Sequence, residues 1–441
     1  MSVLPIVSKV FERLIQVQMN SHIVHFLSPY LCGYRQGFSA QHALMTLIEN
    51  WKKTLDQKGF GGAILMDLSK AFDTLNHELL LAKLNAYGYD KNSLKIIHSY
   101  LSDRYFRTKI NGKFSSWGET FQGVPQGSVL GPLLFNIYLN DLFYVIDLTQ
   151  VCNFADDTTF FACDKNLASL LKRLEHDSLL AIEWFHNNYM KLNQDKCHLL
   201  VAGHKHETVW AEVGEAKIWE SNKEKLLGIT IDRTLNFDDH VFSLCKKSSQ
   251  KLSVLARISN YMSFDKKRIL FKAFVESQFA YLPLIWMFHG RKANSKINHI
   301  HERALRVVYE DNCSSFEELL KKDGSFKIHQ KNIQSLAIEL YKIKNNQSNT
   351  IMNEIFELRN VSYNLRSQTD FDSGLARTNS FGIDSLKYMA AKVWDMVPND
   401  IKNVDSLHIF KSKIRKWEPL NCHCKLCLNY VPELGYINVA Q

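Results

Sequence analysis

The stretch 151–162, VCNFADDTTFFA, places two adjacent acids, Asp156 and Asp157, between two runs of β-branched and aromatic residues. Such runs are typical of strands, and acids between them are typical of turns. We therefore predict a β-hairpin with both aspartates at its tip. Adjacent carboxylates repel by about 1–4 kcal/mol at ~4 Å, a cost that a bound divalent cation would remove. A solvated surface turn is the other interpretation of an isolated Asp-Asp pair, so the rest of the chain must decide.

Length and composition indicate a folded protein of several domains. A chain of 441 residues is too long for one ordinary core, which predicts two to four domains or subdomains. Its longest apolar run, 279–288, contains Pro283 and is about half the ~20 residues that a membrane-spanning helix needs. No secretory signal is recognisable, and the nine cysteines are mostly scattered. We expect an intracellular protein, in the nucleus or cytoplasm, that is not secreted and has no membrane partner.

Positive charge is concentrated in one part of the chain. Residues 241–310 carry thirteen Lys or Arg against four Asp or Glu, and the whole chain has a net charge of +9. A folded segment this basic is a candidate surface for a polyanion. A helix face that is merely solvated explains the same composition, so charge alone leaves both interpretations open.

A second acidic position stands out at the end of a predicted buried strand. Residues 63–68, AILMDL, form a short apolar run that contains Asp67, and the following helix has a capping residue in Asn76 and a stop near Gly88. An acid at the end of a buried strand costs free energy unless it is paired. Asp67 is therefore a candidate site residue, although a cap on the following turn is the plainer interpretation.

Glycine-rich segments mark the predicted turns and loops. Asn111-Gly112 predicts a tight hairpin, and the loop 121–132 carries three glycines and two prolines before an apolar helix. Arg35, flanked by Gly33 and Gly37, is expected on an exposed loop where it could meet a phosphate. An ordinary connector and a plain surface arginine are the alternatives at these two places.

Four stretches, taken in order, resemble the reverse transcriptases of non-LTR (LINE-type, jockey-like) retrotransposons. They are AILMDLSKAFDTLNH (63–77), GVPQGSVLGPLLFNIYLND (123–141), NFADDTTFF (153–161), and MKLNQDKCHLL (190–200) with KLLGITID (225–232). The resemblance implies an α+β fold of the right-hand polymerase type. Its expected parts are partial fingers (1–60), a palm with inserted fingers elements and an antiparallel sheet (61–237), a basic helical thumb (238–310), and a mostly helical C-terminal region with a Cys-rich tail (311–441).

The same resemblance implies roles for individual residues in an RNA-directed DNA polymerase. Two Mg²⁺ ions, with Mn²⁺ as a substitute, would be held by carboxylates and one backbone carbonyl, and a lysine would act as general acid; the matching residues are Asp67, Asp156, Asp157, Leu68 and Lys196. Nucleotide contacts fall to Arg35, Phe72, Gln126 and Gly127, with Phe72 as the ring that would collide with a 2′-hydroxyl. Leu227 and Gly228 match the primer grip. The implied partners are an RNA template, a DNA primer and deoxynucleoside triphosphates, whereas the oligomeric state is not predicted.

The sequence departs from this family pattern in two places. Members usually carry an N-terminal endonuclease and a longer fingers region, whereas this chain starts at MSVLPIVSKVFERL, so we expect a truncated copy. A catalytically inactive, truncated nucleic-acid-binding remnant is therefore the alternative function, and a metal-dependent nuclease is a more distant one. The tail NCHCKLC (421–427) lacks the separated ligand pairs of a zinc knuckle or finger, which favours a reduced tail over a metal site.

Overall fold

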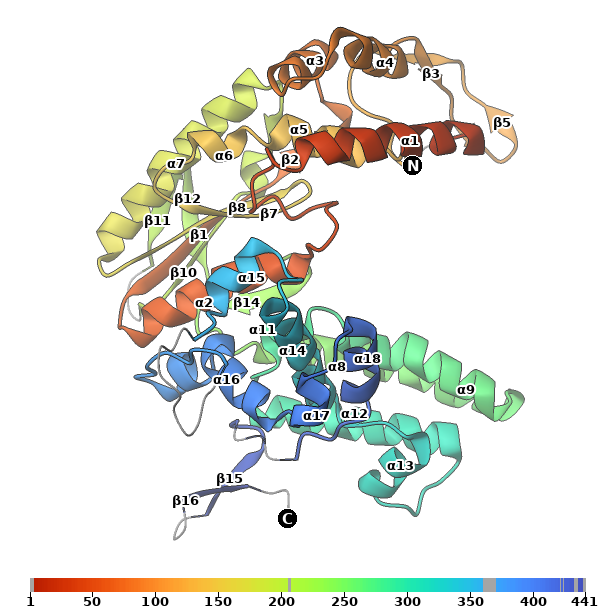
Figure 1. The fold of residues 1–441 in the computed structure, drawn as a ribbon, viewed down its shortest axis with the longest axis vertical. Coiled ribbons are helices and arrows are strands. Elements are labelled where there is room, and N and C mark those ends of the chain that lie inside the picture. Colours follow the sequence, from red (N-terminus) through yellow and green to blue (C-terminus); the bar gives the residue numbers. More distant parts are fainter. Residues whose placement is uncertain are drawn as a thin grey trace. The chain divides into compact units, whose positions relative to one another are not determined.

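The computed structural model describes residues 4–204, 208–359, 370–420, 422, 424–431 and 435–438. The chain forms two compact units, one of Met1–Ala43 with Gly61–Ser221 and the other of Leu44–Phe60 with Asn222–Gln441 (Figure 1). The predicted division into four parts stays a prediction. None of the helices in the described ranges is long and apolar enough to cross a membrane.

The first unit is built on a six-stranded sheet. Its strand order is β11-β12-β10-β1-β8-β7, and three neighbouring pairs, β11–β12, β10–β1 and β8–β7, are antiparallel while β12–β10 is parallel. The strands are β1 (Phe60–Met66), β7 (Gln150–Phe154), β8 (Asp157–Asp164), β10 (His198–Ala202), β11 (Trp210–Val213) and β12 (Ala216–Ser221). Together with the helices around it, this sheet confirms the predicted α+β class.

Helix α7 (Leu167–Asn187) runs along the sheet of the first unit and contacts β8 and β11 (Figure 1). Gly62 of β1 lets this helix come close, because a Cβ atom there would lie 2.9 Å from the Cδ1 atom of Leu174. Helix α5 (Gly131–Leu139) is apolar on all sides and almost entirely buried. The other helices of the unit are α1 (Ile6–Ile23), α3 (His77–Ala86), α4 (Lys91–Leu101), α5 (Gly131–Leu139) and α6 (Leu142–Val145).

Short strand pairs complete the first unit, and two local predictions, a tight hairpin and a helix cap, are confirmed there. Asn111 and Gly112 have φ values of 48° and 82° between β4 (Lys109–Ile110) and β5 (Lys113–Phe114), so they form the predicted tight hairpin. The Asn76 side chain caps α3 by accepting a hydrogen bond from the Leu79 amide at 2.9 Å. The remaining short elements are β2 (Leu68–Ser69) paired with β9 (Lys191–Leu192), β3 (Arg104–Phe106) paired with β6 (Gly118–Thr120), and the 3₁₀ turns η1 (Ala71–Asp73) and η2 (Gln194–Lys196).

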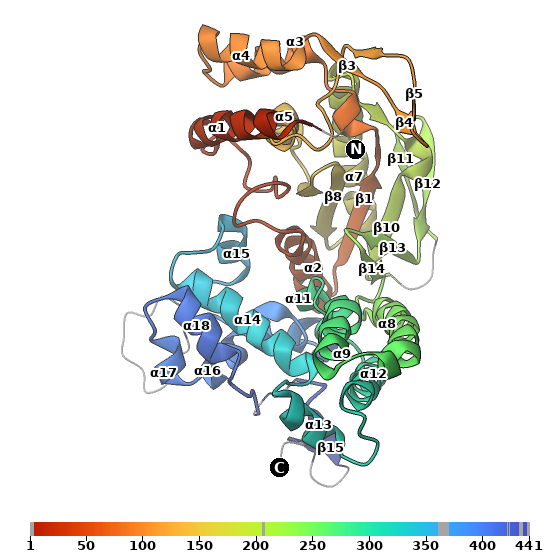
Figure 2. The same cartoon turned by 90° about the vertical axis from the view of Figure 1, so that its right-hand side faces the viewer.

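The second unit is mostly helical. Helices α8 and α12 lie side by side, as do α14, α16 and α18, and one two-stranded hairpin, β13–β14, precedes α8 (Figure 2). Its elements are most of α2 (Ala40–Asp56), β13 (Lys223–Leu226), β14 (Ile229–Asp232), α8 (Asp238–Ile258), η3 (Ser259–Tyr261), α9 (Phe264–Leu270), η4 (Phe271–Glu276), α10 (Ser277–Phe279), α11 (Pro283–Trp286), α12 (Arg291–Tyr309), α13 (Phe316–Asp323), α14 (Ile328–Lys344), α15 (Thr350–Ile355), η5 (Asn379–Ile383), α16 (Leu386–Met396), α17 (Asn399–Lys402), α18 (Leu407–Ile414), β15 (Leu428–Val431) and β16 (Gly435–Asn438).

Buried polar side chains of α2 explain why this early helix belongs to the second unit. Asp56 accepts hydrogen bonds from the backbone amides of Arg377 and Thr378, at 2.9 and 2.7 Å. Glu49 accepts hydrogen bonds from the amides at the start of α16, and Lys52 donates to the carbonyl oxygen of Asp384 at 2.8 Å. Because a buried polar group is costly without a partner, these contacts fix α2 to segments more than 300 residues away.

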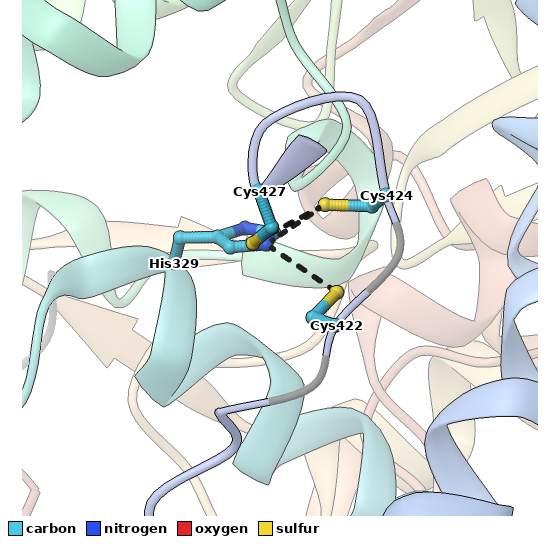
Figure 3. A group of neighbouring side chains, drawn as sticks. All are labelled: His329, Cys422, Cys424 and Cys427. Atoms are coloured by element: carbon cyan, nitrogen blue, oxygen red, sulfur yellow. Dashed lines mark hydrogen bonds between the residues drawn. The ribbon is translucent and has the colours of Figure 1, made fainter. Parts of the chain in front are cut away.

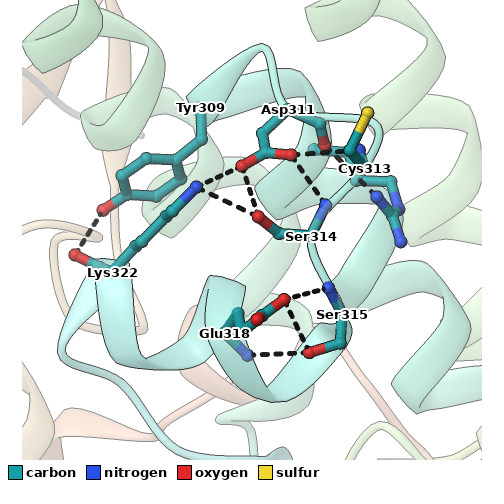
Figure 4. Close-up of polar contacts among 8 residues, drawn as sticks. Tyr309, Asp311, Cys313, Ser314, Ser315, Glu318 and Lys322 are labelled. Atoms are coloured by element: carbon teal, nitrogen blue, oxygen red, sulfur yellow. Dashed lines mark hydrogen bonds and ion pairs between the residues drawn. The ribbon is translucent and has the colours of Figure 1, made fainter.

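A compact polar turn joins α12 to α13 (Figure 4). Asp311 accepts hydrogen bonds from the backbone amides of Cys313 and Ser314, at 3.0 and 2.9 Å, and forms an ion pair with Lys322. Lys322 and then Ser314 hold the pKa of the Asp311 carboxyl group well below its usual value. A Ser315–Glu318 capping box then starts α13, so the direction of the chain is fixed on both sides of the turn.

Candidate active site

The Asp-Asp hairpin forms with a different tip from the one predicted. Phe154 at the end of β7 pairs with Asp157 at the start of β8, so the two turn residues are Ala155 and Asp156. Ala155 has a φ of 59°, a backbone conformation that costs a non-glycine residue about 1–2 kcal/mol. The prediction that both acids sit at the tip is therefore wrong for Asp157, because the strand register pairs this residue with Phe154.

Three residues that sequence reasoning did not assign to the site hold the turn in place. A Cβ atom on Gly33 would lie 2.3 Å from the backbone nitrogen of Ala155, so the chain at Gly33 lies directly against the turn. Asn136 of α5 fixes Gly33 by donating to its carbonyl oxygen at 2.8 Å. Asn153 donates to the carbonyl oxygen of Ala155 at 3.0 Å. Of the three, only Gly33 was noted in the sequence, because it flanks Arg35 in the predicted loop.

Asp67 and Lys196, two of the residues that the resemblance assigned to the site, lie together. Asp67 directly follows β1, the neighbour of β8 in the sheet, and its carbonyl oxygen accepts a hydrogen bond from the Asn193 amide at 2.9 Å. The Nζ atom of Lys196 lies 3.3 Å from the Oδ2 atom of Asp67, and both side chains reach solvent. Leu68, the proposed carbonyl ligand, is in β2, whose pairing with β9 brings η2 and Lys196 to this end of the sheet.

Asp156, Asp157 and Asp67 repel one another electrostatically. Although its side chain reaches solvent, Asp157 has a raised pKa because partial burial desolvates the carboxyl group and because Asp156 and Asp67 add negative charge. Among the described residues, the one group of three or more His, Cys, Asp or Glu side chains close enough to share a metal ion lies elsewhere, and the three aspartates are not part of it. The carboxylates are thus near enough to interact, without converging on a single point.

Phe72 lies in η1 between two other rings. It stacks on Phe135 of α5, with ring centroids 4.3 Å apart and an angle of 16°, and Tyr34 meets it edge-on at 5.9 Å. Tyr34 is exposed, and burial together with the charge of Asp156 raises its pKa. Tyr34 therefore lies between Phe72, the predicted sugar-selecting ring, and the acidic turn. The sequence did not reveal this position.

The glycine- and proline-rich loop packs against η1. Gly123 has a φ of 80°, and a Cβ atom there would lie 2.6 Å from the carbonyl oxygen of Asp73. The Gln126 amide donates to the Asp73 carboxylate at 3.1 Å, and Gly127 follows with a φ of 98°. The loop thus places Gln126 and Gly127 beside the segment that carries Phe72.

Arg35 binds its own loop in this structure. Its NH1 group donates to the carbonyl oxygens of Ser28 and Leu31, and its guanidinium lies 4.2 Å from the ring centroid of Phe38. These contacts give the arginine a structural role in the loop that supports the acidic turn. The predicted triphosphate contact stays a prediction.

Leu227 and Gly228 form the two-residue turn between β13 and β14, in the second unit. Their φ values are 47° and 84°, as a type I′ turn requires. The Tyr281 hydroxyl donates to the carbonyl oxygen of Leu227 at 2.9 Å, and a Cβ atom on Gly228 would lie 3.0 Å from the Tyr281 ring. The residues that match the primer grip therefore form a tight hairpin turn that Tyr281 contacts directly.

The basic segment 241–310 presents most of its charge to solvent. Three of its thirteen basic residues form ion pairs, Lys267 with Glu310, Arg268 with Asp323 and Arg306 with Glu302. A groove between α8 and α12 has cationic and aromatic walls, and Lys296 lies 4.3 Å from the ring centroid of Phe242. Ten of the thirteen are exposed: Lys246, Lys247, Lys251, Arg257, Lys266, Lys272, Arg291, Lys292, Lys296 and Arg303.

Several curated relatives of this chain are transposon proteins. The chain is 26% identical over 323 residues to the "Probable RNA-directed DNA polymerase from transposon BS" of Drosophila melanogaster, and 24% identical over 320 residues to the "RNA-directed DNA polymerase from mobile element jockey" of the same species. Each match covers 70% of this chain and 35% of the relative, so the chain spans about a third of the length of these relatives.

A solved structure, apo telomerase from Candida tropicalis, is 14% identical, with a TM-score of 0.38 over 70% of this chain and 50% of that one, a likeness too distant to carry weight. The match to a family model is different, because it covers more than half of the chain. Residues 1–231 match the model described as "Reverse transcriptase (RNA-dependent DNA polymerase)". This span contains the three carboxylates, the Phe72 segment, the Gln126 loop and the Leu227-Gly228 hairpin, and the chain therefore belongs to the reverse transcriptase family, as its motifs predicted.

Proposed function

We propose that this chain synthesises DNA on an RNA template, as the reverse transcriptase of a jockey-like non-LTR retrotransposon. The observation that supports this most strongly is the grouping of Asp67, Asp156 and Asp157 at the ends of neighbouring strands. There, partial burial and then the negative charge of the other two raise the pKa of Asp157. Perturbed carboxyl groups of this kind cluster at functional sites, which supports a bound cation or a catalytic use.

The donor set fits a hard divalent cation. Asp67, Asp156 and Asp157 offer carboxylate oxygens, Leu68 offers a carbonyl oxygen, and the uncompensated charge at Asp157 is what a cation would neutralise. When bound, two Mg²⁺ ions, or Mn²⁺ in their place, would activate the primer 3′-hydroxyl and stabilise the departing pyrophosphate. Lys196 holds a proton on Nζ beside Asp67, a suitable position for a general acid toward that leaving group.

The aromatic and glycine-rich elements supply nucleotide selection in this proposal. Phe72, held between Phe135 and Tyr34, would exclude a sugar with a 2′-hydroxyl because its ring cannot easily move aside. Gln126 and Gly127 would lie against the nascent base pair, and Arg35 toward the triphosphate. The exposed cations of 241–310 would bind the template–primer backbone without regard to sequence, with the Leu227-Gly228 hairpin near the primer end.

Primer extension on an RNA template tests the proposal. We expect Mg²⁺-dependent incorporation of deoxynucleotides that Asp156→Asn/Asp157→Asn lowers by about a thousandfold or more, because charge stabilisation by metal ions contributes several kcal/mol. Asp103→Asn, at an exposed acid outside the site, is the matched control and should leave the rate unchanged. Equal rates for the double variant and the wild type would refute the proposal.

The same preparation distinguishes the alternative function. A catalytically inactive nucleic-acid-binding remnant would bind the template–primer in a salt-dependent manner and incorporate nothing. One observation favours this alternative. The Arg35 guanidinium donates to the carbonyl oxygens of Ser28 and Leu31, so it is already bound within its own loop and not turned to a triphosphate. Any incorporation that depends on Asp156 and Asp157 would exclude it.

A further inference from the structure

Four side chains from two distant parts of the second unit meet at one point (Figure 3). His329 lies in the first turn of α14, and Cys422, Cys424 and Cys427 come from the C-terminal segment about 93–98 residues later. Their ligand atoms all lie within 4.8 Å of one another, and His329, Cys422 and Cys424 are buried. From these residues we propose a structural Zn²⁺ site that closes the second unit.

The distances suit tetrahedral coordination. The Nε2 atom of His329 lies 3.1 Å from the sulfur of Cys424 and 4.0 Å from that of Cys422, and the sulfurs of Cys424 and Cys427 are 3.7 Å apart. With Zn–S bonds of about 2.3 Å and Zn–N bonds of about 2.0–2.1 Å, tetrahedral geometry puts two sulfurs about 3.8 Å apart and a sulfur and a nitrogen about 3.5 Å apart. The observed separations bracket these values.

The chemical identity of the ligands selects the metal. Three thiolates and one imidazole form one of the standard four-ligand sets for structural zinc, whereas Mg²⁺ and Ca²⁺ require oxygen ligands. Since all four ligands come from the protein, no position remains for a substrate, so the role is structural. The Cys427 amide donates to the Cys424 carbonyl at 3.0 Å, a tight turn that aims both sulfurs the same way.

The arrangement is costly without a metal. His329, Cys422 and Cys424 are buried, and the Nε2 atom of His329 lies 3.1 Å from the sulfur of Cys424, so these polar side chains meet away from water. Burying polar groups costs free energy unless they find partners. The Nε2 atom of His329 faces the sulfurs of Cys424 and Cys422 and is therefore the ligating atom, while Nδ1 on the other side of the ring has no hydrogen-bond partner among the described residues. A bound Zn²⁺ would replace the protons on the thiols and imidazole and neutralise the thiolate charge.

The loop between the cysteines is anchored to other parts of the same unit. Arg291 of α12 donates through Nε to the Lys425 carbonyl at 2.7 Å, and the Lys425 ammonium lies 2.9 Å from the carboxylate of Asp384. Just before the cluster, Gln334 of α14 donates to the Trp417 carbonyl at 2.7 Å. A metal at this point would therefore tie α12, α14 and the segment before α16 to the C-terminal residues.

This site corrects the interpretation of the cysteine tail as a reduced segment without a metal. Within the tail itself, the ligands are not arranged in the separated pairs of a zinc knuckle or finger. The fourth ligand is His329, which lies far upstream and has no flanking motif. Only the folding of α14 against the tail brings it to the cysteines.

Metal analysis of the full chain tests the proposal. Protein purified without added chelator should carry about one zinc per chain by native mass spectrometry and elemental analysis. Cys422→Ser should lose the zinc, whereas Cys313→Ser, at an exposed cysteine of the same unit, should retain it. Because a Cys422→Ser chain that fails to fold also loses zinc, a second variant is needed: His329→Cys should still bind metal.

Cobalt provides a readout of the ligand set. Co²⁺ added to the reduced, metal-free chain should give the visible bands of a tetrahedral thiolate site, and in His329→Cys these bands should shift toward a four-thiolate spectrum. Any of three results would overturn the proposal. The first is zinc retained at full occupancy in Cys422→Ser. The second is a wild-type chain with neither zinc nor cobalt bands. The third is a Cys424–Cys427 disulfide as the stable state of the chain.

Discussion

The acidic site of the first unit and the Cys3His cluster of the second differ in ligand chemistry. The acidic site consists of Asp67, Asp156 and Asp157, and the Cys3His cluster consists of His329 and the three cysteines 422, 424 and 427. The first groups hard oxygen donors that reach solvent and do not converge. The second groups three sulfurs and a nitrogen, largely buried, within 4.8 Å of one another. An open site with spare coordination positions suits a metal that acts on substrates, and a closed site suits a metal that holds the fold. The two sites should therefore respond differently to the same treatments.

Chelators should separate the two sites with the largest effect. EDTA should abolish primer extension, and excess Mg²⁺ should restore it, because the carboxylates exchange their ions with solvent. 1,10-Phenanthroline, whose nitrogen donors prefer zinc to magnesium, should leave the extension rate unchanged while lowering the thermal unfolding midpoint of the chain. The non-chelating isomer 1,7-phenanthroline is the control. If 1,10-phenanthroline stopped extension as fast as EDTA does, the sites would not be chemically distinct.

Gly33→Ala should be the most damaging substitution that leaves every carboxylate in place. The added methyl group would lie 2.3 Å from the backbone nitrogen of Ala155, so the acidic turn must move. A displacement of about 1 Å at a catalytic group can cost about a hundredfold in rate, and we expect a loss of that size in primer extension.

Gly37→Ala is the matched control for this substitution. Its φ of 83° adds a backbone strain that Gly33→Ala does not have, but nothing lies within 4 Å of the added Cβ atom. It should lose little activity. Equal losses in the two variants would mean that loop strain, and not contact with the turn, causes the effect.

These sites also show which features were predictable from sequence. The strand–turn–strand pattern around Asp156, the Asn76 cap and the Asn111-Gly112 turn depend on neighbouring residues, and each was predicted. Gly33 and His329 were missed because each acts on a partner about a hundred residues away, through contacts that only the fold creates. Likewise, Asp67 could be recognised as unusual from its strand, but its 3.3 Å contact with Lys196 depends on the pairing of β2 with β9.

Phe72→Val should relax sugar selection while sparing the carboxylates. The ring stacks on Phe135, so removing it opens space beside η1 without adding charge. We expect the preference for deoxynucleotides over ribonucleotides to fall by about tenfold or more, since a packed contact is worth roughly 1–3 kcal/mol of discrimination. The measurement is kcat/KM for each nucleotide. A conservative Phe72→Tyr variant should retain selection, and unchanged selection in Phe72→Val would assign the ring to packing alone.

Asp157→Asn should have the smallest effect of the substitutions considered. It should raise the stability of the metal-free chain, whereas removing a ligand of the proposed zinc site should lower stability. Because the folded-state pKa of Asp157 is raised, the native chain holds its proton more tightly, and stability falls as pH rises from about 3.9 through that raised pKa.

At pH 7 without metal, removing the charge should therefore raise the free energy of unfolding, by no more than about 1 kcal/mol after solvent screening. Urea denaturation measures this, with Asp103→Asn as a neutral control. Added Mg²⁺ should stabilise the wild type and not the variant. Cys424→Ser should instead lower stability in zinc-loaded protein, because it removes a ligand from a closed site. If metal-free Asp157→Asn lost stability, the carboxylate would make stabilising contacts in the folded chain, and its negative charge would not be a cost that a bound cation removes.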